Sequence, residues 1–291
     1  MAQNKFGEKF ENYIMEMPSL PVSVGKVLEI CGGAAVSPLD LNHVISLDPV
    51  LTGKLLKLIN SAYYGLGCHV TSLVRAVTML GLNTVKNLAL STAILSTLPR
   101  NKRVDGINME GFWYHCLCVG VTSKLLAAKQ GIDSKYLEEY FAAGLLHDIG
   151  KIPLNAVMSS DYMQLVTAAD LQQKTLLAVE NENLGITHCT VGAMIANAWK
   201  LVECPIIDVV TYHHDIDSYS GDNLHLLCDV AIADYFSLVH GIGFSGNRKP
   251  VKPEKNIWDA IGLNEDSFEE LKDKISGEIE KARVFLQVSR N

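Results

Sequence analysis

The chain has 291 residues, of which 48% are hydrophobic and 20% charged, which allows a substantial core in one large domain or two small ones. Its 32 acidic residues outnumber its 25 basic residues, giving a formal net charge of −7, and this balance disfavours nucleic acid as a partner. A polar N-terminus and the absence of ~20 consecutive apolar residues argue against a signal peptide or a membrane partner, so we expect a cytoplasmic protein.

Helical signals recur in the first hundred residues, whereas strand signals are sparse. The segment Ser37–Asp40 (SPLD) is a typical helix start, with a Ser cap, a Pro in the first turn and an early acidic residue. Residues 49–62 have the apolar spacing of an amphipathic helix, and Thr71 and Asn83 can cap the two helices that follow. Residues 60–65 (NSAYYG) are interpreted as the packed C-terminal cap of a helix rather than as a binding site.

The predicted helices lengthen in the second part of the chain. One is expected over Met109–Lys129 and another over residues 134–149, where Gly150 and Pro153 end it. The remaining elements are predicted as helices at 175–182, 188–200, 205–214 and 223–240, a loop at 241–256, and a final helix at Asp266–Gln287.

These elements predict an all-α fold, a multi-helix bundle. The composition changes near residues 98–106 (LPRNKRVDG), which indicates a boundary there. We expect an N-terminal helical subdomain over residues 15–105, a larger helical subdomain over 106–240, and a loop with a C-terminal helix over 241–291.

Histidines and aspartates follow one another in order along the second part. The pair His147-Asp148 occurs in the string LLHDIGK, but His214-Asp215 is a second such pair, so one pair alone carries little weight. A single histidine is more often structural than a ligand; the signal lies in the ordered set on predicted helices or at their ends: His115, His147, Asp148, His188, His213, His214 and Asp234. The other histidines, His43, His69, His225 and His240, are assigned no role, and Asp215 is interpreted as a solvated loop acid.

The residue types in this set suit a pair of metal ions. Neutral imidazoles bind transition metals, and a carboxylate can bridge two ions while keeping the charge of the site low. We therefore predict two transition-metal ions, with Fe, Mn or Ni favoured over Zn, bound inside the helical bundle. Asp148 and Lys151 are the candidate catalytic residues, because the lysine follows closely enough to share the site and hold a phosphate oxygen.

Residues 18–98 resemble the HDOD domain, the HD-related output domain, in the strings MPSLP, ISLDPVLTGKLLKLINSAYYGL and VTSLVRAVTMLGLNTVKNLAL. The later strings GLLHDIGKIPL, TYHHD and VAIADYFS resemble the wider HD phosphohydrolase superfamily. Together the resemblance covers roughly residues 15–240. It implies a bacterial-type signalling protein with an all-helical fold and a metal site built on the His-Asp pair.

The seven positions also match metal ligands of the dinuclear HD-GYP branch of that superfamily, and Lys151 matches the lysine after its His-Asp pair. The chain departs from this branch at two points. Gly111 stands where the branch has a glutamate one helical turn before the first histidine, and the Gly-Tyr-Pro motif is missing from the string HHDIDSYSGDNLH. These departures put cyclic-dinucleotide hydrolysis by that route in doubt.

Two functions follow from the resemblance. The first is a signal-transduction module with a dinuclear metal site, which receives its input from a signalling protein or a phosphate-containing small ligand. The alternative is a metal-dependent phosphohydrolase that acts on a nucleotide or phosphodiester. A helical scaffold without metal ranks last, because it would make all seven matches coincidental. The sequence indicates no oligomeric state.

Overall fold

The computed structural model describes residues 2–31, 37–98, 106–201 and 204–290, and within these ranges the chain forms helices and turns without a strand. The predicted all-α fold is therefore confirmed. The boundary expected near residues 98–106 falls mostly outside the described ranges, so the division into subdomains stays a prediction. None of the described helices combines the length and apolar character needed to cross a membrane.

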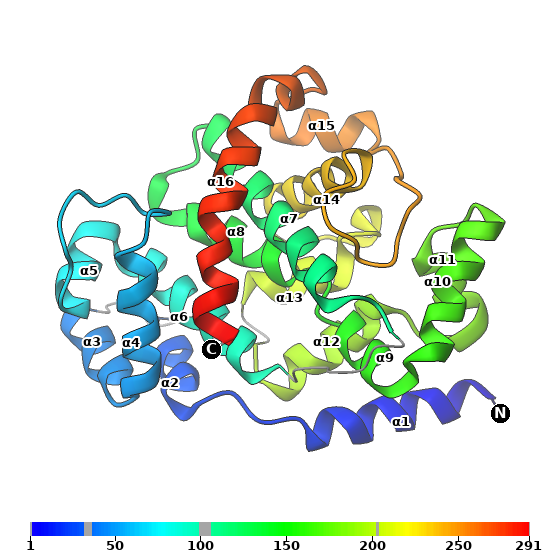
Figure 1. Cartoon of the computed structure of the whole chain (residues 1–291), viewed down its shortest axis with the longest axis horizontal. Coiled ribbons are helices and arrows are strands. Elements are labelled where there is room, and N and C mark those ends of the chain that lie inside the picture. The colour runs from blue at the N-terminus through cyan, green and yellow to red at the C-terminus, as the bar shows by residue number, and fades with distance from the viewer. Residues whose placement is uncertain (1, 32–36, 99–105, 202–203, 291) are drawn as a thin grey trace.

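The first helix lies apart from the next five in the chain. It runs beneath α9 and α12 along the lower edge of Figure 1, whereas the following helices form a group on the left of that view. The bounds are α1 (Ala2–Glu16), α2 (Val22–Cys31), α3 (Pro38–Ser46), α4 (Pro49–Ile59), α5 (Leu73–Leu80) and α6 (Leu82–Thr97).

Side chains at the helix ends explain several of these bounds. Ser37 and Asp40 form a capping box at the start of α3, as the sequence predicted. Helix α4 ends at Ile59, before the predicted Ala62, where the side chain of Asn60 bonds both the N–H and the carbonyl of Val70. The predicted caps of the next two helices were wrong. Ser72, not the preceding threonine, caps α5, and α6 begins directly after Gly81.

The second part of the chain surrounds a central pair, α7 and α8, whose side chains are mostly buried. Helix α7 has its predicted bounds, while α8 ends three residues early and Pro153 lies in the first turn of the next helix, where proline is tolerated. The elements are α7 (Met109–Lys129), η1 (Ser134–Tyr136), α8 (Leu137–Leu146), α9 (Lys151–Met158), α10 (Ser160–Gln172), α11 (Leu176–Leu184), α12 (His188–Ala198), α13 (Pro205–Tyr212), η2 (Ile216–Ser218), α14 (Leu224–Val239), α15 (Lys255–Ile261) and α16 (Asp266–Arg290).

Several contacts join the helices before residue 98 to those after residue 106, among them those of α1 with α9 and α12 and of α6 with α8. Helix α16 packs against α4, α6 and α7 and crosses the front of the molecule in Figure 1. In addition, Tyr63 of the NSAYYG segment packs on Phe141 of α8 and Phe285 of α16. Its hydroxyl accepts a hydrogen bond from Lys124, which also pairs with the buried carboxylate of Glu138. The contacts of Tyr63 agree with the interpretation of that segment as a packing element.

Glycines on both sides of the His-Asp pair allow unusually close backbone contacts. A Cβ atom on Gly144 of α8 would lie 2.8 Å from the Cα atom of Gly120 in α7. A Cβ atom on Gly150, after the pair, would lie 1.9 Å from His188 O and 2.5 Å from Gly192 N, both in α12. The turn at residues 147–150 is thus held against two helices at distances that only glycine permits.

We predict that Gly150→Ala lowers the free energy of unfolding by about 4 kcal/mol or more, because the new methyl group overlaps backbone atoms that cannot rotate away. Gly53→Ala is the matched control. It lies inside α4 with no atom within 4 Å of the added Cβ, so it should raise the free energy of unfolding by about 0.5–1 kcal/mol. Urea unfolding of both variants measures the difference. Equal stability of the two would contradict the close contact at Gly150.

Candidate metal centre

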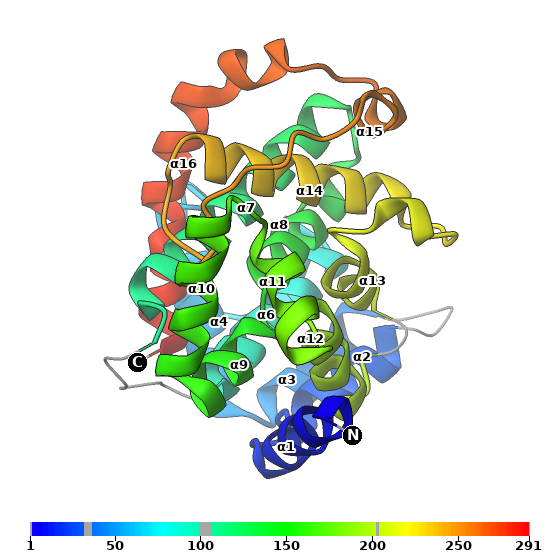
Figure 2. The same ribbon diagram turned by 90° about the vertical axis from the view of Figure 1, so that its right-hand side faces the viewer.

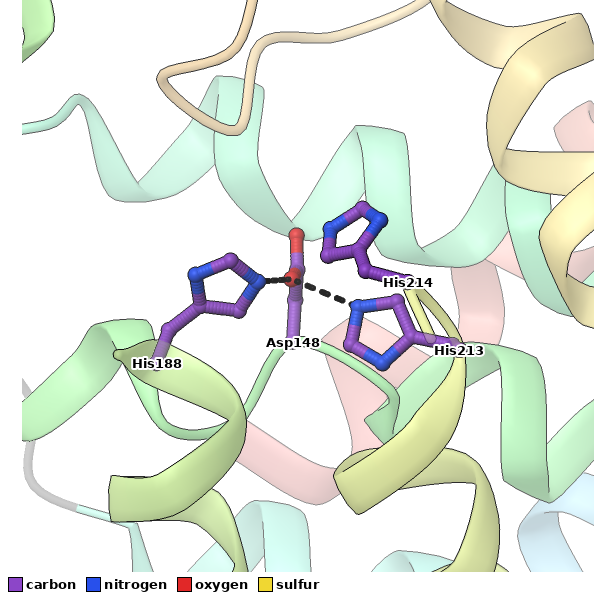
Figure 3. A group of neighbouring side chains, drawn as sticks. All are labelled: Asp148, His188, His213 and His214. Atoms are coloured by element: carbon purple, nitrogen blue, oxygen red, sulfur yellow. Dashed lines mark ion pairs between the residues drawn. The ribbon is translucent and has the colours of Figure 1, made fainter. Parts of the chain in front are cut away.

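Asp148 lies at the centre of the candidate site, in the turn between α8 and α9 (Figure 3). Its Oδ1 atom is 3.5 Å from His188 Nε2 and 3.7 Å from His213 Nε2. Its Oδ2 atom is 3.3 Å from His147 Nε2 and 3.7 Å from His115 Nε2. Each oxygen of one carboxylate therefore faces two imidazoles, an arrangement that is suited to bridging two ions.

The candidate ligands form two groups that share this carboxylate: the first group is His115, His147, Asp148 and Asp234, and the second group is Asp148, His188, His213 and His214. Asp234 belongs to the first group because its Oδ1 atom is 3.1 Å from His115 Nε2. His214 joins the second with an exposed ring whose centroid is 4.1 Å from that of His213. The structure thus brings all seven predicted ligand positions into one pocket.

Each of the four buried histidines is oriented by a hydrogen bond on the far side of its ring. His115 Nδ1 lies 3.0 Å from Ser237 Oγ, and because that hydroxyl donates its own proton to Ile242 O, the imidazole is the donor. His147 and His213 place Nδ1 at 2.7 and 2.8 Å from main-chain carbonyl oxygens, which can only accept. Nδ1 therefore carries a proton in each ring, and Nε2 is the nitrogen that points into the pocket.

The fourth buried histidine, His188, is held by a carboxylate. Glu180 of α11 is completely buried, and its Oε2 atom accepts hydrogen bonds from His188 Nδ1 at 2.6 Å and from the main-chain N–H of the same residue at 2.9 Å. Its Oε1 atom accepts the hydroxyl proton of Tyr162 at 2.5 Å. This arrangement of carboxylate, histidine and pocket is the one that orients and strengthens metal-binding imidazoles.

The inward atoms of the pocket fit a metal centre. Within the described part of the chain, five buried atoms without a hydrogen-bond partner meet here: Nε2 of His115, His147, His188 and His213, and Oδ1 of Asp148. A buried polar atom left without a partner costs about 1–3 kcal/mol, so five at one point need a compensating group. Imidazole and carboxylate donors match transition-metal ions, which the four Nε2 atoms can bind once they carry no proton.

The charges of the pocket also favour cation binding. Burial opposes ionisation of Asp148, but the adjacent His147 and Lys151 hold the pKa of its carboxyl well below the usual range. Lys151 Nζ lies 2.6 Å from Asp148 Oδ2 and 3.5 Å from Ser245 Oγ.

Burial lowers the pKa of His188, but Glu180 raises it to about 9. An ion that binds at this histidine must therefore displace a proton, which makes metal affinity rise with pH.

The predicted loop before α15 helps to build the pocket and ends at residue 254, two residues earlier than expected. It passes beside α10 and returns over α14 to α15 (Figure 2). Phe244 donates its main-chain N–H to Gly111 O, and a Cβ atom on Gly243 would lie 2.3 Å from His115 N. The position where the HD-GYP branch has a glutamate is thus covered by this loop, which packs directly on the backbone of α7.

Beyond the ligand atoms, a cavity of about 350 Å³ opens between α13, α14 and the same loop. Its walls include apolar side chains such as Leu177, Ile216 and Val251. Charged side chains also line it: Asp215, Asp217, Glu254 and Lys252, the last of which pairs with Glu265 outside the cavity at 2.6 Å. This volume is near the lower end of the range found for pockets that bind small molecules.

The sequence prediction missed the side chains that support the ligands, Glu180, Tyr162, Ser237 and Ser245, because no spacing rule links them to the histidines. Among the histidines assigned no role, His43, His69 and His225 are exposed, and His240 packs on Phe236. Asp215 is exposed at the mouth of the cavity.

We predict that Gly243→Ala lowers the free energy of unfolding by about 3 kcal/mol, because the residue has a φ of +72° and its new Cβ would overlap α7. Gly241→Ala is the control, since its φ is +63° but nothing lies within 4 Å of the added atom, and about 1 kcal/mol of backbone strain is expected. Thermal unfolding distinguishes the two. Equal losses would mean that the loop does not press on α7.

Comparison with known proteins places this chain in a family. The HDOD domain model matches residues 17–216. The fold is similar to that of an HDOD domain protein of unknown function from Geobacter sulfurreducens, with a TM-score of 0.76 and 25% identity over 97% of this chain and 98% of the other. It is also similar to a provisionally assigned phosphohydrolase from Shewanella amazonensis, with a TM-score of 0.69 and 22% identity over 96% and 98% of the two chains.

Two further relatives are longer than this chain. A provisionally assigned signal transduction protein from Marinobacter aquaeolei has the same fold, with a TM-score of 0.73 and 18% identity over 94% of this chain and 60% of the other. An uncharacterized protein of Treponema pallidum is 25% identical over 238 residues, which are 79% of this chain but 44% of that protein. Because the family model covers more than half of the sequence, this chain belongs to the HDOD domain family.

Proposed function

We propose that this chain is a signal-transduction module whose histidine- and aspartate-rich pocket binds two transition-metal ions and, with them, a small phosphate-containing ligand. The observation that carries the proposal is the convergence of five buried, unpartnered ligand atoms on one point. Asp148 would be shared between the ions, with the first and second groups supplying the other ligands. Imidazole and carboxylate donors without a thiolate favour Fe, Mn or Ni over Zn.

The cavity limits the size and charge of the ligand. Its volume of about 350 Å³ is small for a ligand pocket, and it opens directly on His213, His214 and Asp234. Asp215, Asp217 and Glu254 at its wall repel additional negative charge. A ligand with one phosphate group therefore fits better than a polyanion such as a cyclic dinucleotide.

The first test is metal content. Protein purified without chelator, then loaded with Mn²⁺, Fe²⁺ or Ni²⁺, should contain two equivalents by elemental analysis, and loading should raise the melting temperature. Affinity should fall as pH decreases, because protons compete for the imidazoles. Asp148→Asn keeps the size of the side chain but should lower the affinity of both ions, while His225→Ala, an exposed histidine, should bind like the unmodified chain. Less than about half an equivalent in the unmodified chain would overturn the proposal.

A second candidate function is hydrolysis of the bound phosphate ester. Lys151 favours it, because this buried cation lies 2.6 Å from the shared carboxylate, where it can stabilise charge on a phosphate oxygen. Bound metal ions would supply Lewis acidity to the phosphorus centre and to an attacking water. The protein itself contributes Asp148 to fix the centre, Lys151 to orient the phosphate, and a largely buried pocket that limits competing water.

Turnover separates the two functions. Fully loaded protein would be incubated with p-nitrophenyl phosphate, bis-p-nitrophenyl phosphate, nucleoside monophosphates and cyclic dinucleotides. If the chain is a hydrolase, Lys151→Met should keep its metal but lose about 10²-fold or more in kcat, which is the usual loss when one charge-stabilising group is removed. Absence of turnover by loaded protein that still binds inorganic phosphate would favour the signalling module. Loaded protein that does not bind phosphate would contradict the proposed ligand.

A further inference from the structure

The two ligand groups differ in charge. The first group contains Asp234 in addition to the shared Asp148, whereas every other member of the second group is an imidazole. A divalent ion bound by the second group would therefore lie in a buried pocket with half of one carboxylate as its direct counter-charge. Burying a cation without enough negative charge is costly, so the second group needs another anion nearby.

Glu180 provides such an anion. Its carboxylate has no exposed surface, and its hydrogen bonds from His188 and Tyr162 engage both oxygens as acceptors. The other three buried histidines donate to neutral groups: Ser237 Oγ, Gly144 O and Val209 O. Of the four oriented imidazoles, only the one in His188 donates its outer N–H to a carboxylate, and it belongs to the group that lacks a carboxylate of its own.

We propose that Glu180 is a positioning residue that acts through His188 to supply the missing negative charge of the second ligand group, so that this group can hold its metal ion. The inference rests on the proposed two-metal centre. A carboxylate that accepts the outer N–H of a metal-binding histidine makes the inner nitrogen a stronger donor, and its removal typically costs 10–100-fold in metal affinity. The effect is confined to the second group, because Glu180 contacts no member of the first.

The test compares two charge-removing variants of the full chain. In Glu180→Gln the side-chain amide oxygen can still accept the proton of His188 Nδ1, so the ring stays oriented while the charge is lost. Mn²⁺ titration, followed by calorimetry and by equilibrium dialysis with elemental analysis, should show one of two binding steps weakened 10–100-fold and the other unchanged. Asp234→Asn should weaken the other step. Two Mn²⁺ ions bound side by side couple magnetically. With one equivalent of Mn²⁺, Glu180→Gln should fill only the first group and therefore give the electron paramagnetic resonance signal of isolated Mn²⁺.

Tyr162→Phe is the structural control. It removes a hydrogen bond from the same carboxylate but leaves the charge and both bonds to His188, so both binding steps should stay within about threefold of the unmodified chain. Melting temperatures of the metal-free proteins check that all variants fold. Two unchanged steps in Glu180→Gln, or two equally weakened steps, would overturn this inference. Failure of the unmodified chain to bind metal would instead overturn the proposed function.

One further measurement needs no variant. With Zn²⁺ as a diamagnetic probe, nuclear magnetic resonance of ¹⁵N-histidine-labelled protein should show that the Nδ1 proton of His188 persists after metal loading and exchanges slowly. That result is expected if the proton stays between His188 and the buried carboxylate. Loss of the Nδ1 proton on loading, or binding of the metal at Nδ1, would contradict the role of Glu180 even if the glutamine variant did not fold.

Discussion

The close packing of backbone against backbone around residues 147–150 is the constraint on which the rest of the structure depends. Gly144 and Gly150 flank the His-Asp pair, and each touches a neighbouring helix at a distance that excludes a side chain. As a result, α7, which carries His115, and α12, which carries His188, are both fixed relative to Asp148 by rigid main-chain atoms. The geometry of the candidate ligands is thus set by the backbone of three elements, and side-chain hydrogen bonds refine it.

Within this rigid frame, the four buried histidines are oriented by hydrogen bonds to three different kinds of group. Main-chain carbonyls orient two histidines, a hydroxyl orients a third, and a buried carboxylate orients the fourth. Lys151 balances the shared aspartate when no metal is bound. The pocket is energetically costly without a bound cation, because its inward Nε2 atoms have no hydrogen-bond partner, and a suitable cation would relieve that cost.

The sequence predicted the fold class, the bounds of α7 and the convergence of the seven candidate side chains, because these depend on helix periodicity and on strings that resemble a known family; their role as ligands stays a prediction. It did not predict α10, which buries only Tyr162, Val166 and Ala169 and so shows a sparse apolar stripe. It also gave no signal for Glu180, since its contact with His188 depends on how the chain turns between α11 and α12. Supporting residues of this kind become visible only when separate helices are placed in space.

The loop that presses on α7 has a consequence for attempts to recreate the fuller ligand set of the HD-GYP branch. A side chain added at residue 111 would begin 3.6 Å from Phe244, and the carbonyl of that glycine already holds the loop in place. A glutamate placed there would therefore begin in van der Waals contact with the loop, and its side chain would have to extend along that segment, so the two would have to be redesigned together.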